Sequence, residues 1–388
     1  MNQTKDRDSC PGITKFHYSS DGILIRIRLP GGLITAPKLY ILSNITNKLG
    51  SSVMELTSRG NIQIRAVVNI EAVIAYIKNI SLLPSTTHDR SRNIVASPLS
   101  GRFGGTIDTR SLITDLDTII QVDFDISKLS SRFWFSIDDG SNNVLSSKSD
   151  VGVYVKNSKV YILILKGHDT KIKFNYTNII NVIINTSKKF IKNQEKNCQI
   201  TSLNYRLDFL KRLTNSRLFE INWLINKKPP VGWFEQRNGK IALGVALPLG
   251  LLHASVAQMF AIKGYSIIIT PWHSIILCDL NPAVAYNFIS KLESTEFILE
   301  ETSYWLKVSS CTGIPRCSLS ETDVRTDAIK ILQSTLLKSL PKLVHNHFVG
   351  CKRACGSPLL GEVLITNDHN YLLYPAYEKI NISVYKKN

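Results

Sequence analysis

The feature that most limits how this chain of 388 residues can fold is an internal repeat. Each copy contains an expected strand, a helix, a hairpin and a second helix, in that order. The first copy comprises residues 22–29, 36–49, 53–57 with 62–67, and 69–80, and the second comprises residues 240–247, 253–263, 266–270 with 275–277, and 282–292. A unit of this size cannot bury the face of its own sheet, so we expect the two copies to combine into one pseudo-symmetric domain.

Two further regions would fold around this domain. Between the copies, the pattern predicts helices at 108–121 and 177–191, strands at 133–137 and 151–164, and a linker at 226–230. After the second copy it predicts a strand at 305–309, a helix at 323–339 and a hairpin that turns at 367–370, and residues 345–349 lead into a second pair of cysteines. Helices and strands that mix in this way indicate an α+β protein.

The hairpin turns of the two copies differ in a way that bears on chemistry. The first turn reads Thr57-Ser-Arg-Gly60 and the second reads Thr270-Pro-Trp-His273, so Arg59 has no cationic counterpart in the second copy. An arginine needed only for the scaffold would have less reason to occur in one copy alone. Arg59 is therefore a candidate for binding an anionic group.

Four of the seven cysteines form two close pairs near the C-terminal end: Cys311 and Cys317, with five residues between them, and Cys351 and Cys355, with three residues between them. Disulfides fit poorly, because no secretory signal is visible and the cysteine count is odd. Zinc sites usually separate paired ligands by two to four residues, so the longer spacer fits zinc poorly. An iron–sulfur cluster is held by four thiolates and tolerates varied spacing. The spacing favours a cluster over zinc or unbonded core cysteines, which both stay open.

The formal charge of +17 predicts an anionic partner. The basic residues are spread along the chain, with no run of four or more lysines and arginines and no aromatic RNA-binding signature. We therefore expect no nucleic-acid partner. Two explanations of the charge stay open: a solvated basic surface, and a small polyanionic substrate bound in a basic cleft.

One segment, Ile241–Ile262, has no charged residue and is long enough to cross a bilayer. It contains Pro248 and lies within the repeat, where it divides into a strand, a turn and a helix, so we expect no membrane partner. The first residues of the chain lack the apolar core of a signal peptide. These observations predict a cytoplasmic protein.

The chain resembles the nitrite/sulfite reductase superfamily along nearly its whole length. Besides the repeat, the resemblance is carried by Leu56–Gln63, by Arg92–Pro98 and by the spacing of the paired cysteines with the Gly-x-Pro that follows them. It implies an α+β fold in which two ferredoxin-like half-repeats form one domain flanked by two α/β lobes. The implied boundaries are 15–82 and 231–300 for the half-repeats, 83–230 for a central lobe with a basic substrate cleft, and 301–388 for a lobe in which Cys311, Cys317, Cys351 and Cys355 hold a [4Fe–4S] cluster.

Within this superfamily the chain is similar to the precorrin-3B synthase family of aerobic cobalamin biosynthesis. The markers are Ser97–Gly101, Ile107–Arg110, Phe135–Gly140 and Ile269–Trp272. The similarity implies a monooxygenase that converts precorrin-3A to precorrin-3B by hydroxylating C20 and forming a lactone. It also implies dioxygen, NADH or another reductant as electron donor, the [4Fe–4S] cluster, and a mononuclear non-haem iron.

The alternative is a sirohaem-dependent assimilatory nitrite or sulfite reductase. The reductases have two lysines flanking a Phe where this chain has Arg132-Phe-Trp134, so the second cation is absent here. Reduction of a small dianion benefits from several converging cations, so Trp134 favours the oxygenase. In the reductase interpretation sirohaem would be a cofactor and Cys355 would bridge the cluster and the haem iron.

Three arginines, Arg59, Arg92 and Arg132, come from separate segments that the superfamily fold brings to one cleft. A precorrin is a flat tetrapyrrole bordered by carboxylates, and the planar fork of arginine suits carboxylates. We therefore predict that these arginines bind the substrate. For the mononuclear iron the sequence selects no ligand set and no catalytic residue; the candidates are His253, His273, His345, His347, and Asp138 or Asp139.

Overall fold

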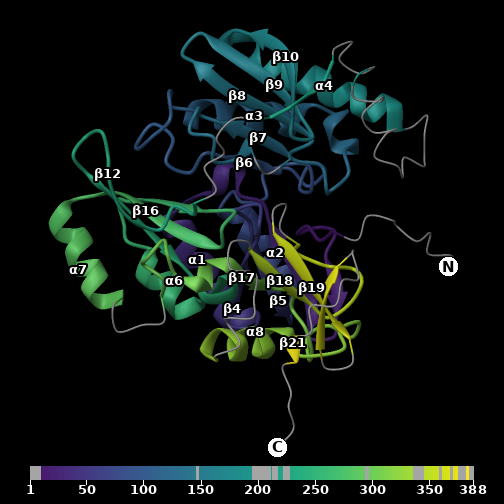
Figure 1. Cartoon of the computed structure of the whole chain (residues 1–388), viewed down its shortest axis with the longest axis vertical. Coiled ribbons are helices and arrows are strands. Elements are labelled where there is room, and N and C mark those ends of the chain that lie inside the picture. Colours follow the sequence, from purple (N-terminus) through teal and green to yellow (C-terminus); the bar gives the residue numbers. More distant parts are fainter. Residues whose placement is uncertain are drawn as a thin grey trace, which may run out of the picture.

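The computed structural model describes residues 10–145, 148–194, 211, 217–221, 228–292, 297–334, 345–357, 361–367, 370–374 and 382–383. The described elements form four β-sheets with helices packed on them (Figure 1). Two of these sheets belong to the repeat, one to the segment between its copies, and one to the C-terminal segment. The predicted α+β fold is confirmed. The predicted boundaries at 15–82, 83–230, 231–300 and 301–388 remain a proposal.

Both copies of the repeat have the same order of elements. The first half-repeat consists of β1 (His17–Ser19), β2 (Gly22–Ile27), the 3-10 turn η1 (Pro30–Gly32), β3 (Leu33–Thr35), α1 (Ala36–Leu49), β4 (Val53–Leu56), β5 (Ile62–Val67) and α2 (Ile70–Asn79). The second consists of β12 (Gly232–Glu235), β13 (Ile241–Ala246), η5 (Pro248–Gly250), β14 (Leu251–His253), α6 (Ala254–Phe260), β15 (Ser266–Ile269), β16 (Ser274–Leu280) and α7 (Pro282–Leu292). Helices α1 and α7 have the predicted bounds, whereas α6 is shorter than predicted because a turn precedes β15.

The two half-repeats exchange a short strand. β3 of the first half-repeat pairs with β15 of the second, with Ile34 opposite Ile267, and β14 of the second pairs with β4 of the first, with Leu252 opposite Met54. The turn before β3 requires glycine: Gly32 has a φ of +73°, and a Cβ there would lie 1.9 Å from the carbonyl oxygen of Ile269. The sequence does not predict these strands, since three residues are too few for a periodic pattern.

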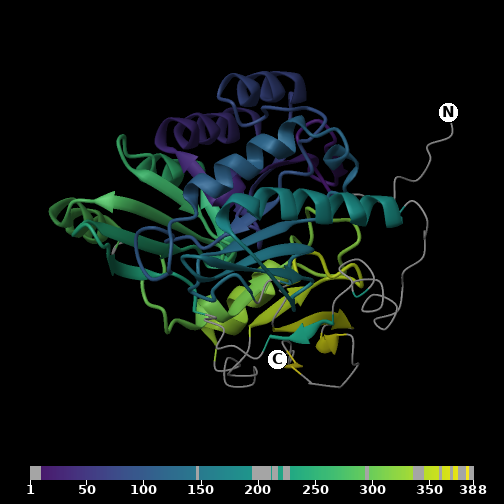
Figure 2. The ribbon, with the colours of Figure 1, turned by 90° about the horizontal axis from the view of Figure 1, so that it is seen from above.

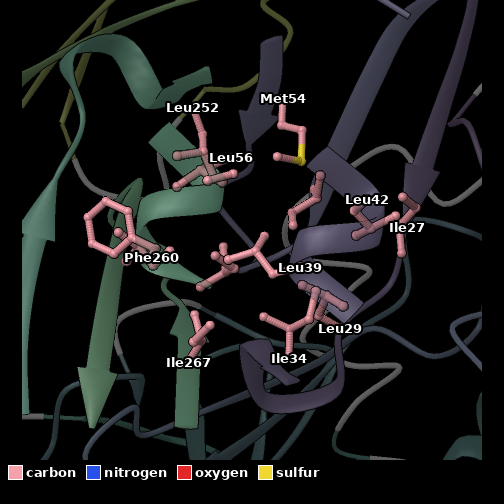
Figure 3. Close-up of a cluster of buried hydrophobic side chains, with 14 of the residues drawn as sticks. Ile27, Leu29, Ile34, Leu39, Leu42, Met54, Leu56, Leu252, Phe260 and Ile267 are labelled. Carbon is pink, nitrogen blue, oxygen red and sulfur yellow. The ribbon is translucent and has the colours of Figure 1, made fainter. Parts of the chain in front are cut away.

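One hydrophobic core lies between the two sheets of the repeat. Figure 3 shows Leu39 and Leu42 of α1 in the same cluster as Leu252, Phe260 and Ile267 of the second half-repeat. Because the cluster draws side chains from both copies, each copy buries its inner face only in the presence of the other. The two half-repeats therefore form one domain, as predicted.

The segment between the copies forms a lobe around a mixed sheet. β6 (Ile94–Ala96), β7 (Phe135–Asp138) and β8 (Val151–Asn157) are parallel, and β9 (Val160–Leu165), β10 (His168–Phe174) and β11 (Phe219–Glu220) continue the sheet antiparallel, with α3 (Arg110–Val122) and α4 (Ile179–Gln194) beside it. The single predicted strand at 151–164 is wrong. The chain reverses after Asn157, whose side chain accepts the backbone N–H groups of Lys159 and Val160. Residues 222–227, which include part of the predicted linker, lie outside the described residues.

The C-terminal lobe has a second mixed sheet. Its strands are β17 (Val308–Ser310), β18 (Asn346–Val349) and β19 (Glu362–Asn367), which are parallel, followed by β20 (Asn370–Tyr374) and β21 (Ile382–Ser383), and α8 (Val324–Gln333) packs on β17 and β18. The hairpin predicted at 367–370 is confirmed. The strand predicted at 305–309 begins instead as the 3-10 turn η6 (Tyr304–Lys307), where the Ser303 hydroxyl accepts the Trp305 N–H. The second part of the helix predicted at 323–339 lies outside the described residues.

The lobes lie on different sides of the repeat domain. In Figure 1 the central lobe is at the top, the second half-repeat at the left and the yellow C-terminal lobe at the lower right. Figure 2, seen from above, shows α4 running across the central lobe, which faces the viewer in this view. No helix among the described residues is long and apolar enough to cross a membrane. The uncharged segment 241–262 contains β13, η5, β14 and α6.

Candidate functional site

The four C-terminal cysteines lie in two loops at one edge of the C-terminal sheet. Cys311 directly follows β17, and Cys351 follows β18 after one glycine. Because β17 and β18 are parallel neighbours, their carboxyl ends lie side by side. The Cys311 N–H donates to the carbonyl oxygen of Phe348 at the end of β18 (2.8 Å). The fold therefore brings the two cysteine pairs to one place.

The Cys311 thiol is near the second pair and near two glycine amides. Burial raises the pKa of Cys311, whereas hydrogen bonds from the backbone N–H groups of Gly350 and Gly313 lower it. The negative charges of Cys355 and Cys351 raise it further. Amides that point at a sulfur stabilise its thiolate form, which is the form that binds iron.

The Cys355 thiol completes this set of contacts. Burial raises the pKa of Cys355, Arg353 lowers it, and the charges of Cys351 and Cys317 raise it. Cys355 therefore lies within electrostatic range of the other three thiols. None of the six described cysteines forms a disulfide.

The donor set fits an iron–sulfur cluster better than a single metal ion. Among the described residues, no three His, Cys, Asp or Glu side chains are arranged to hold one ion. Tetrahedral zinc would require four sulfurs about 2.3 Å from one point. Each thiolate of a [4Fe–4S] cluster binds a different iron, so its four ligands stand farther apart. Disulfide-free thiols in two neighbouring loops, with amide donors beside Cys311, match that requirement.

The loop between Cys311 and Cys317 is held by the first half-repeat. Arg65 of β5 forms a bidentate ion pair with Asp21 (2.8 and 2.9 Å) and donates to the Ser19 hydroxyl (2.7 Å). Its guanidinium also reaches the loop, where it donates to the carbonyl oxygen of Arg316 (3.0 Å) and to the Thr312 hydroxyl (3.5 Å). Arg65 was not among the predicted site residues, because the sequence shows it only as a charged residue within a strand.

Two of the four predicted histidine candidates, His345 and His347, have structural partners. The Ser309 hydroxyl lies 2.7 Å from His345 Nε2 and 2.7 Å from His347 Nδ1, and His347 Nε2 lies 3.0 Å from the Cys355 carbonyl oxygen. Burial lowers the pKa of His347 to about 4, and burial together with His345 and His347 lowers the pKa of His273 to about 3. These imidazoles are therefore neutral at pH 7.

The two aspartate candidates for the mononuclear iron, Asp138 and Asp139, are not part of a metal-ligand group among the described residues. Asp138 is buried, and its carboxylate accepts the backbone N–H groups of Gly140, Asn142 and Val144. Burial raises the pKa of Asp138 to about 6 in spite of these bonds. The described residues thus do not assemble a site for a mononuclear iron.

Two of the three predicted substrate arginines lie near each other. Arg59 is half-buried in the turn between β4 and β5, with its Cζ 5.3 Å from the centre of the Trp134 ring. The charge of Arg132, which is exposed, acts on Arg59 and also lowers the pKa of Cys355. Arg59, Arg132 and the second cysteine pair therefore belong to one region, at the meeting of the three parts of the chain.

Arg92 is placed differently. Its guanidinium is buried and forms a bidentate ion pair with Asp117 of α3 (2.7 and 2.8 Å). To bind a substrate carboxylate it would have to leave Asp117, so its predicted role in binding remains a prediction. The sequence could not show this partner, because Asp117 is one of several polar residues on an amphipathic helix.

A cavity of 690 Å³ lies elsewhere, between the second half-repeat and the C-terminal lobe. Its lining is mainly apolar and includes Pro248, Ile298 and Trp305. It contains none of the predicted substrate arginines.

Comparisons with known proteins agree with this fold. The nitrite/sulfite reductase ferredoxin-like half domain matches residues 19–79, which cover most of the first half-repeat. The solved NirA protein of Mycobacterium tuberculosis superimposes with a TM-score of 0.68 over 90% of this chain and 74% of that chain, at 16% sequence identity. The fold is therefore that of a nitrite/sulfite reductase-like protein.

Two curated relatives are similar over most of the chain. Ferredoxin–nitrite reductase of Synechococcus elongatus is 21% identical over 88% of this chain and 75% of that protein. Precorrin-3B synthase of a Sinorhizobium species is 23% identical over 92% of this chain and 80% of that protein. The resemblance to the nitrite/sulfite reductase superfamily that the sequence predicts is confirmed, and the relatives are redox enzymes.

Proposed function

We propose that this protein is a precorrin-3B synthase-like monooxygenase, which converts precorrin-3A to precorrin-3B with dioxygen and an electron donor such as NADH. The observation that carries the proposal is the environment of Arg59. Its guanidinium lies on the face of Trp134, at the position where the reductases have a second lysine. An aromatic ring at that position lends no charge to a small dianion, but it supports the flat face of an arginine and suits a flat ligand.

The state of Arg92 supports the same choice. Its charge is already neutralised by Asp117, so Arg59 and Arg132 are the predicted cations that are free of a carboxylate partner among the described residues. Two cations that come from separate segments suit a carboxylate at the edge of a large substrate.

In this proposal each group of residues has a defined task. Arg59 and Arg132 hold a substrate carboxylate by charge-assisted hydrogen bonds and so orient the tetrapyrrole. Cys311, Cys317, Cys351 and Cys355 hold the [4Fe–4S] cluster, which would supply electrons one at a time. Gly313 and Gly350 stabilise the thiolate of Cys311 through their amides.

The second candidate is a sirohaem-dependent nitrite or sulfite reductase, in which Cys355 would bridge cluster and haem iron. The similarity to ferredoxin–nitrite reductase favours it. So does the position of Arg132, whose charge reaches Cys355.

One experiment separates the two candidates. Protein purified anaerobically should show cluster absorption without the strong bands of sirohaem, and it should not reduce nitrite or sulfite with an artificial donor. With precorrin-3A and a reductant, product should form only in air and should contain an atom from isotopically labelled dioxygen. Turnover of precorrin-3A without oxygen, or rapid reduction of nitrite, would refute the oxygenase.

A further inference from the structure

A row of polar side chains lies on one face of the C-terminal sheet, beside the cysteine loops. Val308 of β17 and Phe348 of β18 pack in the core of this lobe, so the alternation of the strands turns Ser309 and His347 to the opposite face. Ser309 stands directly opposite His347 in the parallel pair of strands. The Ser309 hydroxyl also meets His345, two residues before His347, so all three side chains share this face. We call Ser309, His345 and His347 the serine–histidine chain.

Hydrogen bonds fix the His347 ring at both of its nitrogens. Its Nε2 lies 3.0 Å from the carbonyl oxygen of Cys355, and because a carbonyl oxygen only accepts, Nε2 carries the proton and donates. In the neutral ring Nδ1 is then an acceptor, and the Ser309 hydroxyl, 2.7 Å away, is the group that can donate to it. The same hydroxyl lies 2.7 Å from Nε2 of His345, whose Nδ1 lies 3.2 Å from the Leu306 carbonyl oxygen. The His347 ring is therefore held between the sheet and the cysteine loop.

The backbone around Cys355 lies close against this ring. Gly356 has a φ of +85°, and a Cβ there would lie 3.3 Å from Cε1 and 3.5 Å from Nε2 of His347. Any larger residue would be strained and would push on the ring. On the other side of Cys355, Ala354 has a φ of +46°, which is unfavourable for a residue with a Cβ and persists only where its surroundings hold it. The conformation next to Cys355 thus has to be maintained by contacts.

The contacts within the loop fix its shape but not its place on the sheet. The Ala354 N–H donates to the Cys351 carbonyl oxygen (3.1 Å), and the Ser357 N–H and hydroxyl donate to the Ala354 carbonyl oxygen (3.3 and 2.6 Å). These bonds all join residues of the loop itself. The bond from His347 is different, because it joins the loop at Cys355 to a residue in the middle of β18. It therefore restricts the residue that carries the fourth thiol.

We propose that His347 is a positioning residue for the [4Fe–4S] cluster. By holding the Cys355 carbonyl oxygen it fixes the direction in which the Cys355 thiolate points, and Ser309 and His345 keep the His347 ring in place. The proposal rests on the cluster assigned under the proposed function, and both candidate functions share that cluster. A thiolate that is already held in its binding geometry loses less freedom when it binds iron, so the serine–histidine chain raises the affinity for the cluster without itself binding iron.

Release of iron from the full-length protein to an excess of EDTA measures how firmly the thiolates hold the cluster. It is followed anaerobically by the loss of cluster absorption. In His347→Leu, which has no side-chain donor, release should be about tenfold to a hundredfold faster, the usual cost of removing a partner that orients a metal ligand. In His347→Gln the rate should return nearly to that of the unmodified protein, because the side-chain amide can donate to the Cys355 carbonyl oxygen as Nε2 does.

His88 provides a matched control in the central lobe. It is 5% exposed, against 1% for His347. Its Nε2 also lies 3.0 Å from a backbone carbonyl oxygen, that of Asp123, and its Nδ1 lies 2.9 Å from the Ser85 hydroxyl. His88→Leu therefore removes an equivalent set of bonds in a different lobe, and iron release should be unchanged. Equal acceleration in His88→Leu and His347→Leu would show a general loss of stability and would overturn the proposal.

Ser309→Ala decides the question if His347→Leu fails to fold. It keeps the His347 ring and removes only the hydroxyl beside it, so release should be at least about fivefold faster, the factor that corresponds to one neutral hydrogen bond. Ser85→Ala, which removes the matching hydroxyl beside His88, should leave release unchanged. A rate in Ser309→Ala equal to that of the unmodified protein would refute the positioning role.

The outcomes also separate this proposal from the proposed function. Unmodified protein without acid-labile sulfide would refute the cluster and the role of His347 together. Failure to oxidise precorrin-3A would overturn only the proposed function, because iron release is measured without turnover.

Discussion

Replacing Arg65 with glutamine should loosen the loop between Cys311 and Cys317. The substitution removes the charge that pairs with Asp21 and the donors that reach Arg316 and Thr312. Asp21 belongs to the same half-repeat as Arg65, so opening of the loop breaks only the hydrogen bonds to Arg316 and Thr312. A hydrogen bond from a charged group contributes about 1.5–3 kcal/mol. A loss of about 3 kcal/mol corresponds to about a hundredfold in the opening equilibrium of the loop.

Hydrogen exchange of two loop amides measures this opening. The Cys317 N–H donates to the Gly313 carbonyl oxygen (3.0 Å) and the Ile314 N–H to the Thr322 carbonyl oxygen (3.1 Å), so both exchange only when the loop opens. In Arg65→Gln both amides should exchange about a hundredfold faster than in the unmodified protein.

The matched control for this experiment is Arg110→Gln. Arg110 and Asp108 form an ion pair whose side chains are 42% and 45% exposed, and exposed pairs contribute about 0–1 kcal/mol. Exchange in the cysteine loop should therefore be unchanged in Arg110→Gln. If Arg65→Gln also left the two amides unchanged, Arg65 would not be what holds the loop.

Three further predictions concern the cluster, the substrate site and the interface between lobes. The intact protein should hold about four acid-labile sulfides per chain, and replacing any one of the four C-terminal cysteines with serine should remove them. The control Cys278→Ser should retain them. Stoichiometric zinc without sulfide would contradict the cluster. Arg59→Ala should weaken tetrapyrrole binding by about tenfold to a hundredfold and leave the melting temperature unchanged. A lowered melting temperature with unchanged affinity would show that Arg59 stabilises the fold and does not bind the substrate. Burial would raise the pKa of Asp279, but hydrogen bonds from Arg102 and Gln236 lower it to about 2. Against an unfolded value of about 3.9, this depressed pKa contributes stability that is present above about pH 4 and is lost as the pH falls toward 2. The denaturation midpoint of the unmodified protein should fall over that range, and Asp279→Asn should lack this part of the fall.

Local patterns were sufficient to predict much of the framework. The bounds of α1 and α7 follow from apolar spacing and from the residues at their ends, which depend only on near neighbours in the chain. The repeat itself predicted one shared core, because neither copy is large enough to bury a sheet alone. The cysteine spacing predicted that both pairs hold one cluster. That the pairs follow neighbouring parallel strands came only from the fold.

The strand exchange between the half-repeats was not visible in the sequence. β3 and β14 have three residues each, and what makes them strands is pairing with β15 and β4 of the other copy. Such pairing depends on contacts between residues far apart in the chain, which a periodic pattern does not contain.

For the candidate site, too, the sequence determined some properties and the tertiary structure determined others. The sequence by itself determined which residue types are present: four thiols in two loops, and arginines in the turn after β4 and along β2. Only the tertiary structure decided their partners, because a guanidinium is held by whichever carboxylate, ring or sulfur the fold places beside it. Arg92 meets Asp117 and is neutralised, Arg59 meets the face of Trp134, and Arg26 meets the sulfur of Cys10. Three arginines that are alike in the sequence thus differ in their capacity to bind an anion.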